Sequence, residues 1–169
     1  LRQHNEKLLP LHFPDYTPPT LVSRDPARLV AFAATHERVV LKPLEDCSGR
    51  GIRITDRHQV EDAVRMFHGH TVIAQRFLDG VVQGDKRIMV LDGAPIGVVN
   101  RIPQDAAHLA NIHQGARVEA GDITAAEHRI LDAVRPRLQQ WGVWLAGLDF
   151  IDGVLTEINI TSPSAARQI

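Results

Sequence analysis

The first half of the chain alternates two patterns of apolar residues, which predict helices and strands in turn. Helical spacing follows two capping signals, Asp25-Pro26 and Asp56, because aspartate caps a helix start and proline suits the first helical position. Runs of apolar residues at 38–42, 52–55 and 71–77 predict strands. The apolar residues at helical spacing are Leu29, Phe32 and Ala33 after the first cap, and Val60, Ala63, Val64 and Phe67 after the second.

Asp-Gly pairs mark two hairpins in the second half. Residues 85–91 and 94–102 are expected to turn at Asp92-Gly93, and residues 148–163 contain two further strands joined at Asp152-Gly153. Asp-Gly favours tight hairpin turns because both residues tolerate positive φ.

The segment between the hairpins combines a loop with a helix. Residues 103–122 follow neither period and are expected to form a long loop. The capping box from Thr124 to Glu127 then begins a helix that should end at Gly142. Hairpins and separate helices in this order favour an α+β fold over a doubly wound parallel sheet.

Length and composition fit one domain or two small lobes of a soluble globular protein. The chain has 169 residues, of which 44% are hydrophobic and 23% charged. A net charge of −1 gives no reason to expect nucleic acid as a partner, and no apolar run reaches the roughly 20 residues that span a membrane. The single cysteine, Cys47, fits a reducing, cytoplasmic location. The chain starts at Leu1, so a piece of a longer protein is one interpretation.

Three polar side chains stand at alternating positions among the apolar residues of the last hairpin. Asp149, Glu157 and Asn159 supply oxygen ligands on half-buried strands, where a charge is costly unless something compensates it. A hard divalent cation such as Mg²⁺ provides that compensation. The alternative is an edge strand whose polar residues face water.

A shared metal face sets a requirement on the strand register. A two-residue turn at Asp152-Gly153 alone would put Asp149 and Glu157 on opposite faces. A three-residue loop, Ile151-Asp152-Gly153, or a bulge of equal effect would restore the shared face. The same requirement applies to Arg87 and Arg101 around the first hairpin turn.

Basic residues at strand ends could bind anions. Lys42 ends an apolar strand beside a Gly/Ser loop and could meet a phosphate, although a snorkelling lysine explains the same pattern. Arg87 and Arg101 could clamp an anionic substrate, or they could be solvated hairpin charges.

These features, in this order, resemble the ATP-grasp domain of bacterial glutathione synthetases. The matching stretches cover nearly the whole chain: Asn5-Glu6-Lys7, residues 17–22, Leu41-Lys42-Pro43-Leu44, Gly84-Asp85-Lys86-Arg87, Arg101-Ile102-Pro103-Gln104, Gly147-Leu148-Asp149 and residues 156–163.

The resemblance implies two α+β lobes with antiparallel sheets that grip ATP, one over residues 1–77 and the other over 78–169. The resemblance also implies that the family's amino-terminal substrate domain is absent from these 169 residues. The implied activity is an ATP-dependent, cytoplasmic carboxylate–amine ligase that joins γ-glutamylcysteine to glycine through an acyl phosphate. Its cofactors would be ATP and Mg²⁺, or Mn²⁺ in its place, and a homo-oligomer is a possible assembly, as for many members.

Each implied role falls on a matching position. Lys7 and Lys42 would hold phosphates, Asp85 would lie near the ribose, and Arg87 and Arg101 would face the acyl substrate and the migrating phosphoryl group. The adenine hinge would be Gln75, Arg76, Phe77 and Leu78, and the metal ligands would be Asp149, Glu157 and Asn159.

Two loops depart from the family pattern. The loop at 45–51 has acidic residues where the family is richer in glycine, and Leu109 stands where an arginine is usual. An ATP- and Mg²⁺-binding module without ligase turnover, and a related ligase with another acceptor, are therefore alternatives, as is a purely structural domain.

Overall fold

The computed structural model describes residues 5–45, 51–103 and 117–164. The chain divides into two compact units. The central unit comprises residues 18–77, and the terminal unit combines the described residues within 1–17 and 78–169. The boundary after Phe77 is the one expected from sequence, but residues 1–17 cluster with the second half of the chain instead of with residues 18–77. Residues 46–50 and Leu109, where the sequence departs from the family pattern, lie outside the described residues.

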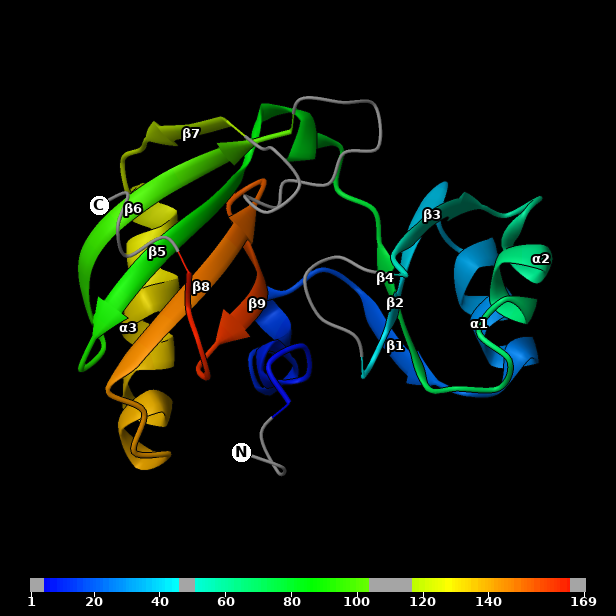
Figure 1. The fold of residues 1–169 in the computed structure, drawn as a ribbon, viewed down its shortest axis with the longest axis horizontal. Coiled ribbons are helices and arrows are strands. Elements are labelled where there is room, and N and C mark those ends of the chain that lie inside the picture. The colour runs from blue at the N-terminus through cyan, green and yellow to red at the C-terminus, as the bar shows by residue number, and fades with distance from the viewer. Residues whose placement is uncertain (1–4, 46–50, 104–116, 165–169) are drawn as a thin grey trace. The chain divides into compact units, whose positions relative to one another are not determined.

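The central unit is a four-stranded antiparallel sheet covered on one face by two helices (Figure 1). The strand order is β1-β4-β2-β3, and every neighbouring pair is antiparallel. The elements are β1 (Thr20–Ser23), α1 (Pro26–Ala34), β2 (Arg38–Pro43), β3 (Arg53–Asp56), α2 (Val60–Arg65) and β4 (Val72–Arg76). The sequence pattern predicted both helices and three of these strands, but it did not identify β1 as a strand.

Strand alternation gives this sheet two different faces. Val39, Leu41 and Ala74 point to the helices and are buried in the core, together with Leu29 of α1. The neighbouring residues in the strands, including Lys42 and Gln75, therefore lie on the opposite face. At the start of α1 the Asp25 carboxylate accepts a hydrogen bond from Ala27 N at 2.9 Å, as the capping signal predicted.

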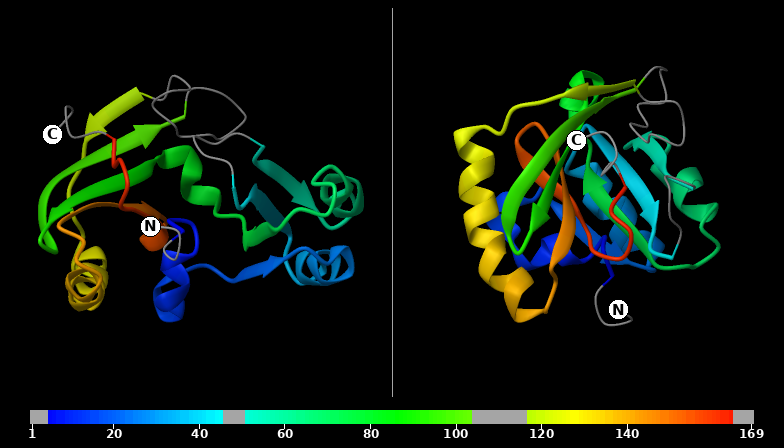
Figure 2. Two further views of the ribbon diagram at one scale, coloured as in Figure 1. Left: turned by 60° about the horizontal axis from the view of Figure 1, so that its bottom comes forward. Right: turned by 60° about the vertical axis from the view of Figure 1, so that its left-hand side comes forward.

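The terminal unit is a five-stranded antiparallel sheet in the order β7-β6-β5-β8-β9, with α3 along one face (Figure 2). Its strands are β5 (Asp85–Leu91), β6 (Ala94–Ile102), β7 (Arg117–Ala120), β8 (Leu145–Ile151) and β9 (Val154–Asn159). Its helices are α3 (Ala125–Gln140) and the 3₁₀ turns η1 (Leu9–His12), η2 (Pro14–Tyr16) and η3 (Asp79–Gln83). The expectation of an uninterrupted loop over residues 103–122 is wrong, because β7 pairs with β6 inside it.

Helix α3 is held at both ends by the motifs that the sequence predicted. Thr124 Oγ1 accepts from Glu127 N at 3.2 Å, while Glu127 Oε2 accepts from Thr124 N at 2.7 Å. At the other end Gly142 has φ +68°, and Val143 N donates to Leu138 O at 2.9 Å, which ends the helix and redirects the chain towards β8. No helix in the described ranges is long and apolar enough to cross a membrane.

Both hairpins turn in two residues and then correct their register with a bulge. In the last hairpin, Ile151 pairs with Val154 across Asp152-Gly153, and both turn residues have positive φ. The register shifts beyond Phe150, so that Thr156 becomes the extra residue and Asp149 pairs with Glu157. Of the two arrangements predicted here, the three-residue loop is not formed and the bulge of equal effect is present.

The first hairpin follows the same plan. Leu91 pairs with Ala94, the register shifts between Met89 and Val90, and Asp85 then pairs with Arg101. The extra residue falls next to Pro95, which has no N–H to donate to the ladder. The predicted odd-to-odd register is therefore confirmed in both hairpins, and each puts its polar residues on one face.

Candidate functional site

A cluster of four charged residues occupies the face of the terminal sheet opposite α3. Ile88, Leu148 and Phe150 point into the core under the helix. Their strand neighbours therefore point the other way, and Arg87 lies directly opposite Asp149 in the β5–β8 ladder. Asp85 and Arg101 form the adjacent cross-strand pair. The register thus brings together residues 62 positions apart in the sequence.

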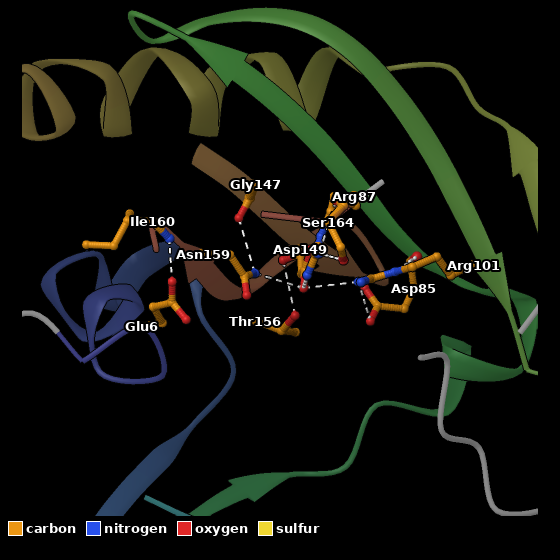
Figure 3. A network of polar contacts seen from close by, with 10 residues as sticks. All are labelled: Glu6, Asp85, Arg87, Arg101, Gly147, Asp149, Thr156, Asn159, Ile160 and Ser164. Carbon is orange, nitrogen blue, oxygen red and sulfur yellow. Dashed lines mark hydrogen bonds and ion pairs between the residues drawn. The ribbon is translucent and has the colours of Figure 1, made fainter. Parts of the chain in front are cut away.

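The ion pairs of this cluster are short (Figure 3), and all of its side chains are buried except that of Asp85, which is 20% exposed. Arg87 grips Asp149 with two parallel hydrogen bonds, Nε to Oδ1 at 2.6 Å and Nη2 to Oδ2 at 2.6 Å. Arg101 Nη2 bridges the two carboxylates, 2.7 Å from Asp85 Oδ2 and 3.0 Å from Asp149 Oδ2. Arg87 and Arg101 are each 5% exposed and Asp149 is 3% exposed. These arginines are therefore not solvated hairpin charges.

The two carboxylates of the cluster differ in their affinity for protons. Burial opposes ionisation of Asp149, but the charges of Arg101 and Arg87 outweigh it and hold its pKa below the usual range. Burial raises the pKa of Asp85 to about 7, against the opposing effect of Arg101. Within the described part of the chain, Asp85 Oδ1 is buried without a hydrogen-bond partner. Burial opposes the charge of Arg101, but Asp149 and Asp85 raise its pKa above the usual range.

The predicted metal ligands share a face next to this cluster. Asp149 pairs with Glu157 and Gly147 pairs with Asn159 in the β8–β9 ladder. Asn159 Nδ2 donates to Gly147 O at 3.3 Å and to Asp149 Oδ2 at 3.2 Å, which directs its amide oxygen away from the carboxylate. The bulged Thr156 donates from Oγ1 to Asp149 O at 3.1 Å (Figure 3). Two carboxylates and an amide oxygen are ligands of the kind that Mg²⁺ prefers.

The chemistry of these ligands fits a magnesium ion under two conditions. Among the described residues, no group of three or more His, Cys, Asp or Glu side chains is arranged to hold a metal. A site here therefore needs the amide oxygen of Asn159 as a ligand. It also needs Asp149 to share its carboxylate between the cation and the two arginines.

A second group of polar side chains lies on the face of the central sheet opposite α1 and α2. Lys42 Nζ donates to Gln75 Oε1 at 2.9 Å, and Gln75 Nε2 donates to Thr20 Oγ1 at 2.9 Å. Apolar residues on the same face surround these side chains, namely Val22, Val40, Ile54 and Ile73. Lys42 therefore has a buried hydrogen-bond partner, Gln75, which is not expected of a snorkelling lysine.

The remaining residues expected to form the hinge differ in exposure. Arg76 is exposed, whereas Leu78 is 7% exposed. The guanidinium of Arg38 lies 4.2 Å from the centre of the Phe77 ring, and Phe77 N donates to Arg38 O at 3.0 Å. Phe77 is therefore fixed in position from one side.

Two residues that the sequence did not single out support the terminal unit's polar face. Glu6 Oε1 accepts three hydrogen bonds, from Ile160 N at 2.6 Å, Thr161 N at 2.7 Å and Thr161 Oγ1 at 2.8 Å. Glu6 thereby ties the segment that contains Lys7 to the end of β9 (Figure 3). Ser164 Oγ accepts from Arg87 Nη1 at 2.9 Å. The only signal for Glu6 is its place in the Asn5-Glu6-Lys7 stretch, because its partners are more than 150 residues away.

Comparison with known proteins identifies the family. A model of the prokaryotic glutathione synthetase ATP-grasp domain matches residues 6–169. The chain belongs to this family. Similar proteins include glutathione synthetases of Synechocystis sp., 42% identical over 176 residues, and of Brucella melitensis, 36% identical over 174 residues. Both matches cover 100% of this chain but 54% and 56% of the relatives, so the chain spans about half the length of the curated relatives that it matches.

Solved structures show the same ATP-grasp fold at low sequence identity. D-cycloserine synthetase DcsG aligns over 99% of this chain and 65% of its own, with a TM-score of 0.75 and 17% identity. D-alanyl-alanine synthetase A from Vibrio cholerae aligns over 92% of this chain and 55% of its own, with a TM-score of 0.67 and 13% identity. The predicted α+β ATP-grasp fold and the resemblance to bacterial glutathione synthetases are both confirmed.

Proposed function

We propose that this chain is the ATP-grasp portion of an ATP-dependent carboxylate–amine ligase of the glutathione synthetase type. The observation that supports this most directly is the polar face of the terminal unit, where Asp149 lies between two buried arginines and beside Asn159 and Glu157. Phosphoryl transfer requires charge neutralisation and positioning more than a covalent nucleophile, and this face supplies both.

The proposed nucleotide contacts are the residues that the family resemblance implies. Lys42 and Lys7 would each bind phosphate oxygens, and Asp85 would lie near the ribose. The hinge residues Gln75, Arg76, Phe77 and Leu78 would lie near adenine. The aliphatic residues beside Lys42, on the face of the central sheet opposite its helices, suit a flat aromatic base.

Asp149, Glu157 and Asn159 would hold Mg²⁺, or Mn²⁺ in its place. The bound ion would neutralise phosphate charge and orient the phosphates. Arg101 lies at the junction of the two carboxylates and would face the acyl substrate and the transferring phosphoryl group. Arg87, with three of its nitrogens engaged by Asp149 and Ser164, would act there chiefly by orienting the Asp149 carboxylate.

The proposed substrates are γ-glutamylcysteine and glycine, because the similar full-length proteins are glutathione synthetases. Phosphorylation of the dipeptide carboxylate by ATP would release ADP and form an acyl phosphate. Attack by the glycine amine would then form the peptide bond and release phosphate. A cytoplasmic location and a homo-oligomeric assembly belong to the same proposal.

Nucleotide titration tests the first half of this proposal. Binding of Mg-ATP to the chain, measured by calorimetry, should weaken about tenfold or more in Lys42→Ala, because a charge-assisted phosphate contact contributes about 1.5–3 kcal/mol. Arg65→Ala is the matched control, because it removes one positive charge from an exposed ion pair of the same unit. Equal affinity in wild type and Lys42→Ala would contradict the proposed phosphate role and favour a purely structural domain.

Phosphate release tests the second half. ATP hydrolysis that depends on both γ-glutamylcysteine and glycine supports the ligase. Tight Mg-ATP binding without phosphate release, with these or other acceptors, would favour a nucleotide-binding module that has lost turnover. Release with a different amine acceptor would identify a related ligase.

A further inference from the structure

We propose that Gln75 is a positioning residue that holds the Lys42 ammonium in place for phosphate, through a hydrogen-bonded chain that starts at Thr20. This inference rests on the proposed function of Lys42. It assigns the Gln75 side chain to the lysine instead of to the adenine base.

The strand register brings the three side chains together. In the β2–β4 ladder Lys42 pairs with Ile73, so Gln75 is its diagonal neighbour two residues further along the same face. In the β1–β4 ladder Gln75 pairs directly with Thr20. Long side chains can reach across such a diagonal, and here the Nζ–Oε1 distance is 2.9 Å.

The chemistry of the groups sets the direction of every hydrogen bond in this chain. A lysine ammonium can only donate, so the amide oxygen of Gln75 must face it. The amide nitrogen then faces Thr20 Oγ1, at 2.9 Å. Thr20 Oγ1 in turn donates its proton to Pro18 O at 2.8 Å. Each acceptor is thus paired with a donor, and the amide of Gln75 is engaged at both ends.

Burial makes this arrangement stiff. Gln75 is 6% exposed, so an unpaired amide oxygen or nitrogen would be costly, and the side chain has little freedom to turn towards another partner. A neutral amide also suits the purpose better than a carboxylate. It accepts a hydrogen bond from Lys42 without neutralising the positive charge that phosphate requires.

The test uses calorimetry to compare the Mg-ATP affinity of variants at each residue of the hydrogen-bonded row from Thr20 to Lys42. Gln75→Leu removes the acceptor at similar side-chain volume and should raise the dissociation constant about tenfold, which corresponds to about 1.4 kcal/mol. Thr20→Val removes only the hydrogen bond farthest from Lys42 and should raise the dissociation constant about threefold. Thr35→Val is the matched control, because the Thr35 hydroxyl caps Phe32 O on an exposed helix end of the same unit, and it should leave affinity unchanged.

A double-mutant cycle separates positioning from direct contact. If Gln75 acts through Lys42, Gln75→Leu should change affinity less than twofold in the Lys42→Ala background. Gln75→Glu should also weaken binding, because it places a negative charge beside the lysine. The melting temperature of each variant shows whether the central unit is intact.

Each outcome decides a separate question. Failure of the wild-type chain to bind Mg-ATP would refute the proposed function. Normal binding by Gln75→Leu, or a full tenfold loss that persists without Lys42, would refute the positioning role while leaving the proposed function standing. Should Gln75→Leu fail to fold, the comparison of Thr20→Val with Thr35→Val decides, and equal affinities of the two would overturn the inference.

Discussion

Replacing Arg87 with methionine should strongly destabilise the terminal unit. The substitution keeps much of the aliphatic stem but removes both short hydrogen bonds to Asp149, whose side chain is 4% exposed. Removing one partner of a buried ion pair typically costs about 3–5 kcal/mol, because the other charge is left buried. Arg101 still lies 3.0 Å from Asp149 Oδ2, so we expect the lower end, about 3 kcal/mol.

Urea unfolding followed by tryptophan fluorescence measures this cost in the terminal unit, which contains the ion pair. Both tryptophans, Trp141 and Trp144, belong to the terminal unit, so their emission reports the structure that contains the ion pair. Arg117→Met is the matched control. It removes an arginine from the exposed Arg117–Glu119 pair of the same unit and should cost less than about 1 kcal/mol.

A double mutant tests whether the cost comes from the stranded carboxylate. In an Asp149→Asn background the charge that Arg87 compensates is gone, so Arg87→Met should cost only about 1 kcal/mol. Equal destabilisation by Arg87→Met and Arg117→Met would refute the reasoning. So would an undiminished cost of Arg87→Met in the Asp149→Asn background.

Two further predictions concern pH and the amino-terminal segment. Because the pKa of Asp85 rises from 3.8 to about 7 on folding, the native state binds the extra proton in that interval, and its contribution to the free energy of unfolding falls as pH rises from about 4 to about 7. The loss is at most about 4 kcal/mol. The Asp85→Asn variant should lack this pH-dependent loss. The difference in the free energy of unfolding between wild type and variant, measured by urea titration, should therefore decrease over this pH range. Parallel pH profiles of the two proteins would contradict the assignment. Glu6→Ala removes the acceptor of three hydrogen bonds and should cost about 2 kcal/mol, whereas Glu6→Gln should retain most of the stability. Hydrogen exchange at the Ile160 and Thr161 amides should speed up in Glu6→Ala, and unchanged exchange would argue against the tie.

Local sequence signals predicted much of the fold correctly because they depend on neighbouring residues. The Asp25 cap, the Thr124–Glu127 capping box and the Gly142 helix end all form as expected. Strand β7 was missed, since four residues at a sheet edge with one half-buried side chain show little apolar alternation.

The hairpins show where local reasoning reached its limit. The need for an odd-to-odd register follows from alternation alone, and the structure meets it. The means could not be chosen from the sequence. Asp152-Gly153 adopts a two-residue turn with both φ angles positive, and the correction falls at Thr156, where the hydroxyl bonds back to Asp149 O.

The sequence by itself determined the longer elements, the odd-to-odd register requirement, the family and the polar residues available for chemistry. Spacing and capping act within a few residues, so they can be recognised without the fold. Only the tertiary structure decided which polar side chains contact one another. Arg87 grips Asp149, Gln75 holds Lys42 and Glu6 ties down Thr161 because sheet pairing and packing bring together segments that are 33 to 155 residues apart. Burial raises the energetic importance of these contacts, because a charge excluded from water needs a partner, and the linear sequence does not show which residue that partner is.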